Sequence, residues 1–269
     1  KIMIIIGWSE LPNYAVDCIN FLKLKKKLII LTDNKKANKL IKNSKVKIIN
    51  LSQNYTWEEI GITNPKYFFF TGWNNKAFIF LTKQKKTKNI CLVDNVLKKN
   101  LRQFFGKIYF KIFLEKIFDA IFVPGKHSKN LIKYFGFKKS IFQGLYTGNN
   151  KIFRNRIIIT KRKYDFIYVG KFIERKNLNI LLGAFNKIKN LNIKVNLLLV
   201  GGKKQKSKND VEVIPFSNSK RVAKLMGNSK CLILPSLEEN WGVVVHESSC
   251  CGCLLILSNK VGARDEFLN

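Results

Sequence analysis

The residues whose types and spacing could do chemistry gather between Pro235 and Gly252. Glu239 and Glu247 are separated by seven residues there, the first in a loop and the second in a helix that is expected to begin after Gly242. A strand end that leads into a helix amino end is where open α/β sheets bind ligands, and the N–H groups of that helix suit a phosphate. Two carboxylates beside an anion site need neutral hydrogen-bond donors, and sugar hydroxyls are such donors. The segment therefore predicts a site that holds a phosphate and sugar hydroxyls.

A pair of lysines supplies the second candidate group. Lys171 and Lys176 are five residues apart, one at the end of an expected strand and one at the start of the next helix. We expect both ammonium groups to point at a diphosphate. The sequence contains no Asp-x-Asp triplet, so a metal-held phosphate has no support in it. Taken alone, such a pair is more often a solvated surface pair, and the neighbouring acidic motif is what favours a site.

Both segments resemble the signature of the retaining group 1 (family 4) glycosyltransferases. The acidic motif is similar in its Pro-Ser, in its two glutamates with seven residues between them, and in the small residues that end in Cys-Gly. The upstream match, over residues 168–178, reads as strand, glycine, basic residue, four residues and lysine. Residues 198–202 resemble the family's glycine turn, and residues 258–267 resemble the stretch after the next strand. The resemblance covers about residues 119–269.

The resemblance implies a role for each of these residues. Lys171 takes the position usually held by arginine, which keeps the charge and loses the bidentate fork, and with Lys176 it would neutralise the departing nucleoside diphosphate. That task falls to a metal in other enzymes, so neither a metal nor a cofactor is expected. Glu247 would accept hydrogen bonds from ribose hydroxyls, and Glu239 would contact the donor sugar. The implied donor-binding set is Gly170, Lys171, Lys176, Glu239, Asn240, Trp241, Gly242 and Glu247.

The sequence contains fewer signals for residues that bind the acceptor. Asp94 follows an expected strand at residues 90–93 and is the best-placed acid for an acceptor hydroxyl, whereas the simpler interpretation is that it is the N-cap of the helix that follows. The histidine of the first half, His127, aligns better with a turn after the last strand of that half. His246 is interpreted as a lone helix histidine with no role. The predicted catalytic residues are Lys171, Lys176, Glu239 and Asp94.

Short apolar runs alternate with helical patterns along the whole chain, which predicts doubly wound parallel sheets. Expected strands are residues 2–6, 28–32, 46–50, 67–70, 90–93, 120–123, 165–169, 195–200, 211–214, 231–234 and 254–257. Expected helices are residues 14–22, 76–83, 97–117, 178–189, 219–226 and 243–251. The resemblance implies two Rossmann-like domains facing a cleft, the GT-B architecture. We expect an acceptor-side domain at residues 1–150 and a nucleotide-sugar-binding domain at 151–269, the second incomplete because the family usually continues with further helices.

The composition of the chain limits which partners and which compartment are expected. The chain has 269 residues and a formal net charge of +33, which attracts anionic partners such as nucleic acid, acidic membrane or phosphorylated substrates. Lysines are spread over the whole chain, however, and no aromatic and basic stripe or known module marks a nucleic-acid binder. The six cysteines form no evident disulfide framework, which favours a reducing, cytoplasmic compartment. The cluster Cys250, Cys251 and Cys253 is interpreted as small packed residues, because adjacent cysteines chelate a metal poorly and further ligands are missing.

One expected helix, residues 97–117, alternates Phe, Ile and Leu with Lys and Arg. A basic amphipathic helix of this kind can lie on an anionic membrane. A helix packed on its own sheet shows the same pattern, and we favour that interpretation.

These observations predict a cytoplasmic glycosyltransferase that moves a sugar from a nucleotide-sugar donor to a saccharide or lipid-linked acceptor hydroxyl. Retention, metal independence and a place in surface polysaccharide, lipopolysaccharide or glycolipid synthesis come only from the resemblance. Peripheral contact with an anionic membrane is kept as a partner hypothesis, and a nucleic-acid partner is disfavoured. The alternatives are a non-catalytic, degenerate GT-B domain that acts as a partner subunit, and a basic nucleic-acid-binding protein.

Overall fold

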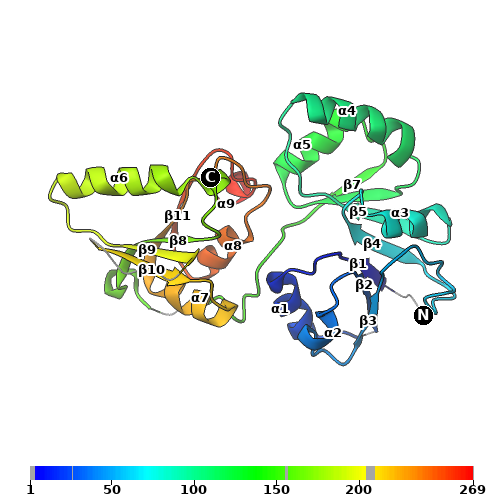
Figure 1. Cartoon of the computed structure of the whole chain (residues 1–269), viewed down its shortest axis with the longest axis horizontal. Helices are drawn as coiled ribbons and strands as arrows, with labels where there is room; N and C mark the ends of the chain where they lie inside the picture. Colours follow the sequence, from blue (N-terminus) through cyan, green and yellow to red (C-terminus); the bar gives the residue numbers. More distant parts are fainter. Residues whose placement is uncertain (1–3, 26, 155–156, 204–209, 269) are drawn as a thin grey trace. The chain divides into compact units, whose positions relative to one another are not determined.

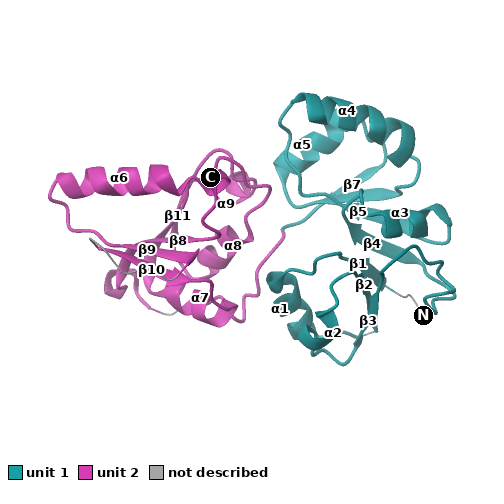
Figure 2. Ribbon diagram, in the orientation of Figure 1, with its two compact units in different colours: residues 1–145 teal, residues 146–269 magenta. Residues whose placement is uncertain are grey.

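The protein consists of two compact units, residues 1–145 and residues 146–269 (Figure 2). The structure is a computed structural model that describes residues 4–25, 27–154, 157–203 and 210–268. The sequence-based boundary, at 150/151, lies a few residues further along the chain. Each unit has a parallel sheet with helices on both faces, so each is built as a doubly wound α/β domain.

The first unit has a seven-stranded sheet in the order β3-β2-β1-β4-β5-β6-β7, and every neighbouring pair is parallel. Its strands are β1 Ile4–Gly7, β2 Leu28–Thr32, β3 Val46–Asn50, β4 Tyr67–Thr71, β5 Lys88–Leu92, β6 Ala120–Val123 and β7 Ser140–Gln143. Its helices are α1 Asn13–Phe21, α2 Ala37–Leu40, α3 Lys76–Lys83, α4 Leu101–Tyr109 and α5 Lys126–Phe135, with a π-helical turn, η1, at Phe110–Leu114. The strand order reverses between β1 and β4.

Apolar residues on the two faces of this sheet build two separate cores. Ile29 and Leu31 of β2 point to the face covered by α3, α5 and η1, where aliphatic residues share the core with Trp57, Phe68 and other aromatic residues. The neighbouring Ile30 points to the other face, against α1 and α2. Burial on both faces explains why these strands read as continuous apolar runs.

The second unit has a five-stranded parallel sheet in the order β10-β9-β8-β11-β12. Its strands are β8 Tyr164–Val169, β9 Leu197–Gly202, β10 Val211–Pro215, β11 Ser229–Leu234 and β12 Leu254–Leu257. Its helices are α6 Leu178–Asn190, α7 Ser219–Gly227, α8 Val243–Cys250 and α9 Arg264–Phe267, with 3₁₀ turns η2 at Ile159–Lys161 and η3 at Glu174–Lys176. Here α6 and α7 lie on opposite sides of the sheet (Figure 1).

Alternate residues of β9 show how this sheet is covered. Leu198 and Val200 join the core that contains residues of α7, whereas Leu197 and Leu199 join the core that contains residues of α6. The period of two along the strand therefore sends side chains to opposite helical layers.

The sequence-based elements agree with most of this architecture. Strands β2, β3, β6 and β12 and helix α3 have the expected bounds. Residues 2 and 3 of the first expected strand lie outside the described residues, and that strand continues to Gly7. Four elements were missed. Strand β7 is a short, largely exposed edge strand, α5 begins where a turn was expected, and α2 and α9 are helices of only four residues each. No helix among the described residues is both long enough and apolar enough to span a bilayer.

Candidate functional site

The predicted donor residues follow the two central strands of the second unit. Strand β8 is hydrogen-bonded to β11, and the chain leaves β8 toward one edge of the sheet and β11 toward the other. Such a reversal opens a crevice at the carboxyl ends of the strands, which is where doubly wound sheets bind ligands. The segments after β8 and β11 therefore form the candidate site.

Lys176 and Glu239 meet at this edge. The Lys176 ammonium contacts Oε2 of the Glu239 carboxylate, and the two side chains are only 10% and 13% exposed. A guanidinium nitrogen of Arg175, Nη1, lies 3.7 Å from the same oxygen. The structure thus joins two predicted site residues into a largely buried ion pair with a second cation beside it.

Arg175 also ties the loop after β11 to the 3₁₀ turn η3. Its carbonyl oxygen accepts a hydrogen bond from the N–H of Leu237 at 2.8 Å, and its Nη1 donates to the carbonyl oxygen of Glu238 at 3.0 Å. Sequence analysis assigned no role to Arg175. Its position directly before Lys176, in the segment that resembles the family motif, is the signal that could have found it.

Lys176 is a cation whose charge depends on its surroundings. Burial lowers the pKa of its ammonium to about 8, and the nearby Arg175 charge acts in the same direction. The Glu239 carboxylate opposes both effects because it favours the protonated form. An anion that approached this ammonium would stabilise its charge in the same way.

Lys171 lies beyond the end of β8, next to Gly170, and is exposed. Its carbonyl oxygen accepts a hydrogen bond from the Tyr168 hydroxyl at 3.0 Å, and burial raises the pKa of that phenol to about 12. The phenol therefore holds the backbone of the turn. The Lys171 side chain is in solvent, in contrast to the buried Lys176.

The loop from Glu239 to Gly242 is held by backbone contacts to residues beyond β12. Glu239 forms a parallel bridge with Val261, and the carbonyl oxygen of Glu239 accepts from the N–H of Gly262 at 2.9 Å. Trp241 is 3% exposed and donates from Nε1 to the carbonyl oxygen of Tyr146 at 2.7 Å, so its indole belongs to the core. Asn240 is half-buried, and Gly242, at φ 91°, directly precedes α8.

Glu247 is half-buried on α8, and its Cγ would lie 2.5 Å from a Cβ added to Gly148. The neighbouring His246 accepts a hydrogen bond at Nδ1 from the N–H of Gly148 at 3.1 Å, and burial lowers the pKa of the imidazole. A neutral His246 therefore fixes the segment that borders Glu247, which gives this histidine a structural role.

Asp94 belongs to the first unit, where it follows β5 and is half-buried. Burial raises the pKa of its carboxyl group. The N-cap alternative for Asp94 is wrong, because the next helix begins only at Leu101 and Asn100 is its N-cap, accepting from the N–H of Gln103 at 3.0 Å. An acceptor-side role for Asp94 stays a prediction.

Three further buried groups lie in the second unit, one hydroxyl and two thiols. The Ser236 hydroxyl, in the turn after β11, is buried and has no hydrogen-bond partner within the described part of the chain. Cys251 and Cys253 are packed in the core, and burial raises their pKa values to about 12 and about 11. The cysteines therefore behave as small apolar residues with protonated thiols.

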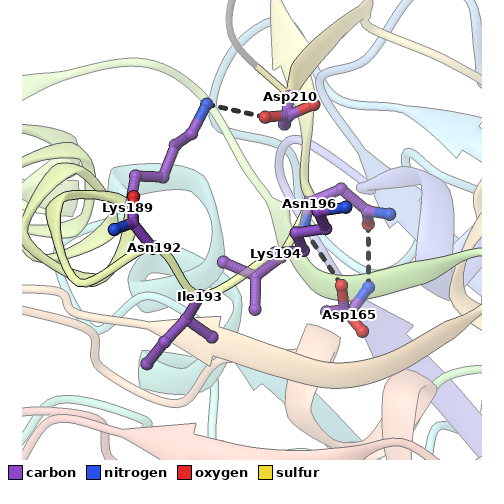
Figure 3. Close-up of a pocket in the computed structure, with 8 residues that line it drawn as sticks. Asp165, Lys189, Asn192, Ile193, Lys194, Asn196 and Asp210 are labelled. Carbon is purple, nitrogen blue, oxygen red and sulfur yellow. Dashed lines mark hydrogen bonds and ion pairs between the residues drawn. The ribbon is translucent and has the colours of Figure 1, made fainter.

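A surface pocket of about 540 Å³ lies at the other end of the same sheet, where β8, β9 and β10 begin (Figure 3). Lys189 pairs there with Asp210 at 2.6 Å, and Asp165 exchanges backbone-to-side-chain hydrogen bonds with Asn196 at 2.9 and 3.0 Å. Since these groups satisfy one another and lie at the amino ends of the strands, the pocket is separate from the candidate site.

Comparisons with known proteins show what the two units are similar to. Residues 149–269 match the family model described as Glycosyl transferases group 1. The uncharacterized glycosyltransferase MJ1178 of Methanocaldococcus jannaschii is 27% identical over 184 residues, which are 64% of this chain and 48% of the relative. The chain thus spans about half the length of that curated relative.

Solved structures show the same fold at low sequence identity. Anabaena HepE in complex with UDP has a TM-score of 0.73 at 12% identity, over 98% of this chain and 82% of its own. The apo structure of OtsA has a TM-score of 0.71 at 9% identity, over 99% of this chain and 86% of the OtsA chain. Sucrose-phosphate synthase from Thermosynechococcus elongatus has a TM-score of 0.70 at 13% identity, over 98% of this chain and 83% of the synthase chain. The fold is that of the GT-B glycosyltransferases.

Proposed function

We propose that the protein is a glycosyltransferase that binds a nucleotide-sugar donor on its second unit and transfers the sugar to an acceptor hydroxyl. The observation that carries the proposal is the Lys176–Glu239 pair at the strand-order reversal of a domain that matches the group 1 glycosyl transferases. Buried opposite charges at the ligand edge of such a sheet suit a ligand that has both an anionic and a hydroxyl-rich part.

In this proposal the bound donor separates the ion pair between Lys176 and Glu239, and each side chain then contacts the donor instead. The diphosphate takes the Lys176 ammonium, and Glu239 is released to accept hydrogen bonds from the sugar. Glu247 accepts from the ribose hydroxyls. The acceptor oxygen bonds to the anomeric carbon with retention, while the bond from that carbon to the phosphate oxygen breaks. The negative charge that builds on the diphosphate is stabilised by Lys171, Lys176 and the N–H groups at the start of α8. The acceptor hydroxyl gives its proton to the carboxylate proposed as its base, Asp94.

The donor nucleotide is proposed to be a uridine diphosphate sugar, because several structures of similar fold are complexes with UDP, UDP-glucose or UDP-2-fluoro glucose. Binding is proposed to be independent of metal, since the lysines supply the positive charge. Asp94 is proposed to accept from the acceptor hydroxyl, and its pKa, raised by burial, suits it to take up a proton. The acceptor is a saccharide or a lipid-linked saccharide made on the cytoplasmic side, as in surface polysaccharide, lipopolysaccharide or glycolipid synthesis.

Calorimetric titration with UDP in the presence of EDTA tests the donor site. We expect binding without added metal, and we expect Glu247→Gln to weaken it by about 1–3 kcal/mol because a hydrogen bond to a charged group is lost. Lys189→Ala is the matched control, since Lys189 is a paired surface lysine at the other end of the sheet. A strict requirement for Mg²⁺ or Mn²⁺ would overturn metal independence. Binding without sugar transfer or donor hydrolysis would support the non-catalytic alternative.

A further inference from the structure

Helix α4 and the π-helical turn η1 have two apolar faces. One face packs inward: Phe110 and Leu114 are 1% and 3% exposed, and Phe110 contacts the rings of Trp73 and Phe135. This packing agrees with the interpretation favoured from the sequence. At about 100° per residue, Leu101 lies roughly opposite Phe110, and the side chains near Leu101 point away from the core.

The outer face is apolar as well. Its residues recur at the spacing of one helical stripe and are well exposed: Leu101 78%, Phe104 50%, Phe105 64%, Ile108 44% and Ile112 58%. Tyr109 and Phe113 widen the stripe, at 53% and 57% exposed. In the described structure α4 lies beside α5, at the outer side of the first unit (Figure 1). A stripe of this size is far larger than the scattered exposed apolar residues of an ordinary surface.

The stripe has a basic border. Lys98, Lys99, Arg102, Lys111 and Lys116 are exposed, and Lys107 lies over the ring of Tyr134 at 4.8 Å. The one acidic residue between positions 98 and 116 is Glu115, which pairs with Lys111 at 3.4 Å. A second copy of this chain would bring the same cations against one another, in a protein whose net charge is +33. An anionic surface is complementary to both the stripe and its border.

We propose that α4 and η1 form a docking surface for an anionic phospholipid bilayer. The segment from Leu101 to Leu114 lies in the plane of the interface, with the apolar stripe at the boundary between headgroups and acyl chains and the cations among the lipid phosphates. The aromatic rings of Phe104, Phe105 and Tyr109 suit that depth. This surface belongs to the first unit and shares no residue with the donor site, so it goes beyond the proposed transferase activity.

Vesicle sedimentation with the full chain tests the proposal. We expect binding to vesicles of phosphatidylcholine with 30% phosphatidylglycerol, weak binding to pure phosphatidylcholine, and a fall in binding as salt is raised. The double variant Phe105→Ser/Ile108→Ser removes the centre of the stripe and is expected to lower binding at least about tenfold. Phe216→Ser is the matched control, because Phe216 is 73% exposed in the second unit and lies outside the stripe.

A second pair of variants tests the basic border. Arg102→Gln/Lys116→Gln is expected to weaken binding to the anionic vesicles about fivefold for each charge removed, whereas Lys220→Gln/Lys224→Gln on α7 removes two exposed cations elsewhere. All these positions are on the surface, and a thermal melt of each variant checks that it folds. Equal binding to neutral vesicles, unchanged binding of the Phe105/Ile108 variant, or dimerisation that this variant abolishes would overturn the proposal. Loss of UDP binding in a Glu247→Gln variant would count against the proposed donor site and not against membrane docking.

Discussion

At the scale of residues, the candidate site is a contact between groups far apart in the sequence. Lys176 and Glu239 are 63 positions apart, yet they form a pair with little exposure to solvent. The sequence predicted that each belongs to the site, because each lies in its own short motif. It could not predict that they neutralise each other, since that depends on how two loops pack. The burial of Trp241 had no sequence signal for the same reason.

The Lys176 ammonium gives donor binding a pH dependence. Its pKa is lowered to about 8, so the charged form predominates below that pH and is lost as pH rises through it. A diphosphate binds the charged form better, so we expect UDP affinity to fall above pH 8, by up to about tenfold per pH unit. Lys176→Arg keeps its charge and should give a flat profile over the same range. Calorimetry between pH 6.5 and 9.5 compares the two, and identical profiles would remove Lys176 from the diphosphate site.

Removal of the carboxylate should show what the pair contributes to stability. Glu239→Gln leaves a largely buried ammonium without its counter-ion, and we expect the free energy of unfolding to fall by about 2–4 kcal/mol at pH 7. The loss should shrink above pH 8, where the lysine becomes neutral. Asp210→Asn is the control, because the Lys189–Asp210 pair is 30% and 58% exposed and should contribute less than about 1 kcal/mol. Urea unfolding of both variants measures the two losses in the free energy of unfolding. Equal losses would contradict the argument that the buried pair contributes more than the exposed one.

At the scale of elements, the site depends on the loop between β11 and α8 and on its backing segment. A Cβ added to Gly262 would collide with the carbonyl oxygen of Asn240. We therefore expect Gly262→Ala to displace this loop, to lower stability by about 1–3 kcal/mol and to weaken UDP binding. Gly183, inside α6, has no atom within 4 Å of an added Cβ, so Gly183→Ala should be neutral or stabilise by about 1 kcal/mol. Thermal melts and UDP titration of both variants measure the difference. If the Gly262→Ala protein were as stable as the Gly183→Ala protein, the loop would be able to accommodate the added Cβ without loss of stability.

Elements were predictable where local pattern and tertiary burial agree. Strands such as β3 and β12 and helix α3 combine apolar periodicity with clear ends, and their bounds match the structure. The expected helix at 97–117 begins only at Leu101, because Asn100 caps it, and its last part is the π-helical turn that ends at Leu114. Strand β7 has little buried surface and thus little pattern, and only pairing with β6 defines it. Local sequence does not contain that pairing.

At the scale of the whole molecule, each unit has its own cores, and donor binding is assigned to one of them. A unit with its own core can unfold by itself, so heating should give two transitions. In the proposed function UDP binds only the folded second unit, so at a hundredfold excess over its Kd it should stabilise that unit by about 2.7 kcal/mol, which raises its transition by roughly 10 °C. The transition of the first unit should stay where it was.

The tryptophans provide a probe for each unit without any substitution. Trp57 is fully buried in the first unit and donates to the carbonyl oxygen of Leu81, whereas Trp241 is buried in the second. The chain has four tryptophans, and in protein labelled with 5-fluorotryptophan the ¹⁹F resonances assigned to Trp57 and Trp241 should therefore be lost at separate temperatures during heating. UDP should delay the loss of the Trp241 resonance alone, and Trp57 serves as the internal control. If both resonances disappeared in one transition, or if UDP protected Trp57 instead, the assignment of independent units with the donor on the second would be wrong.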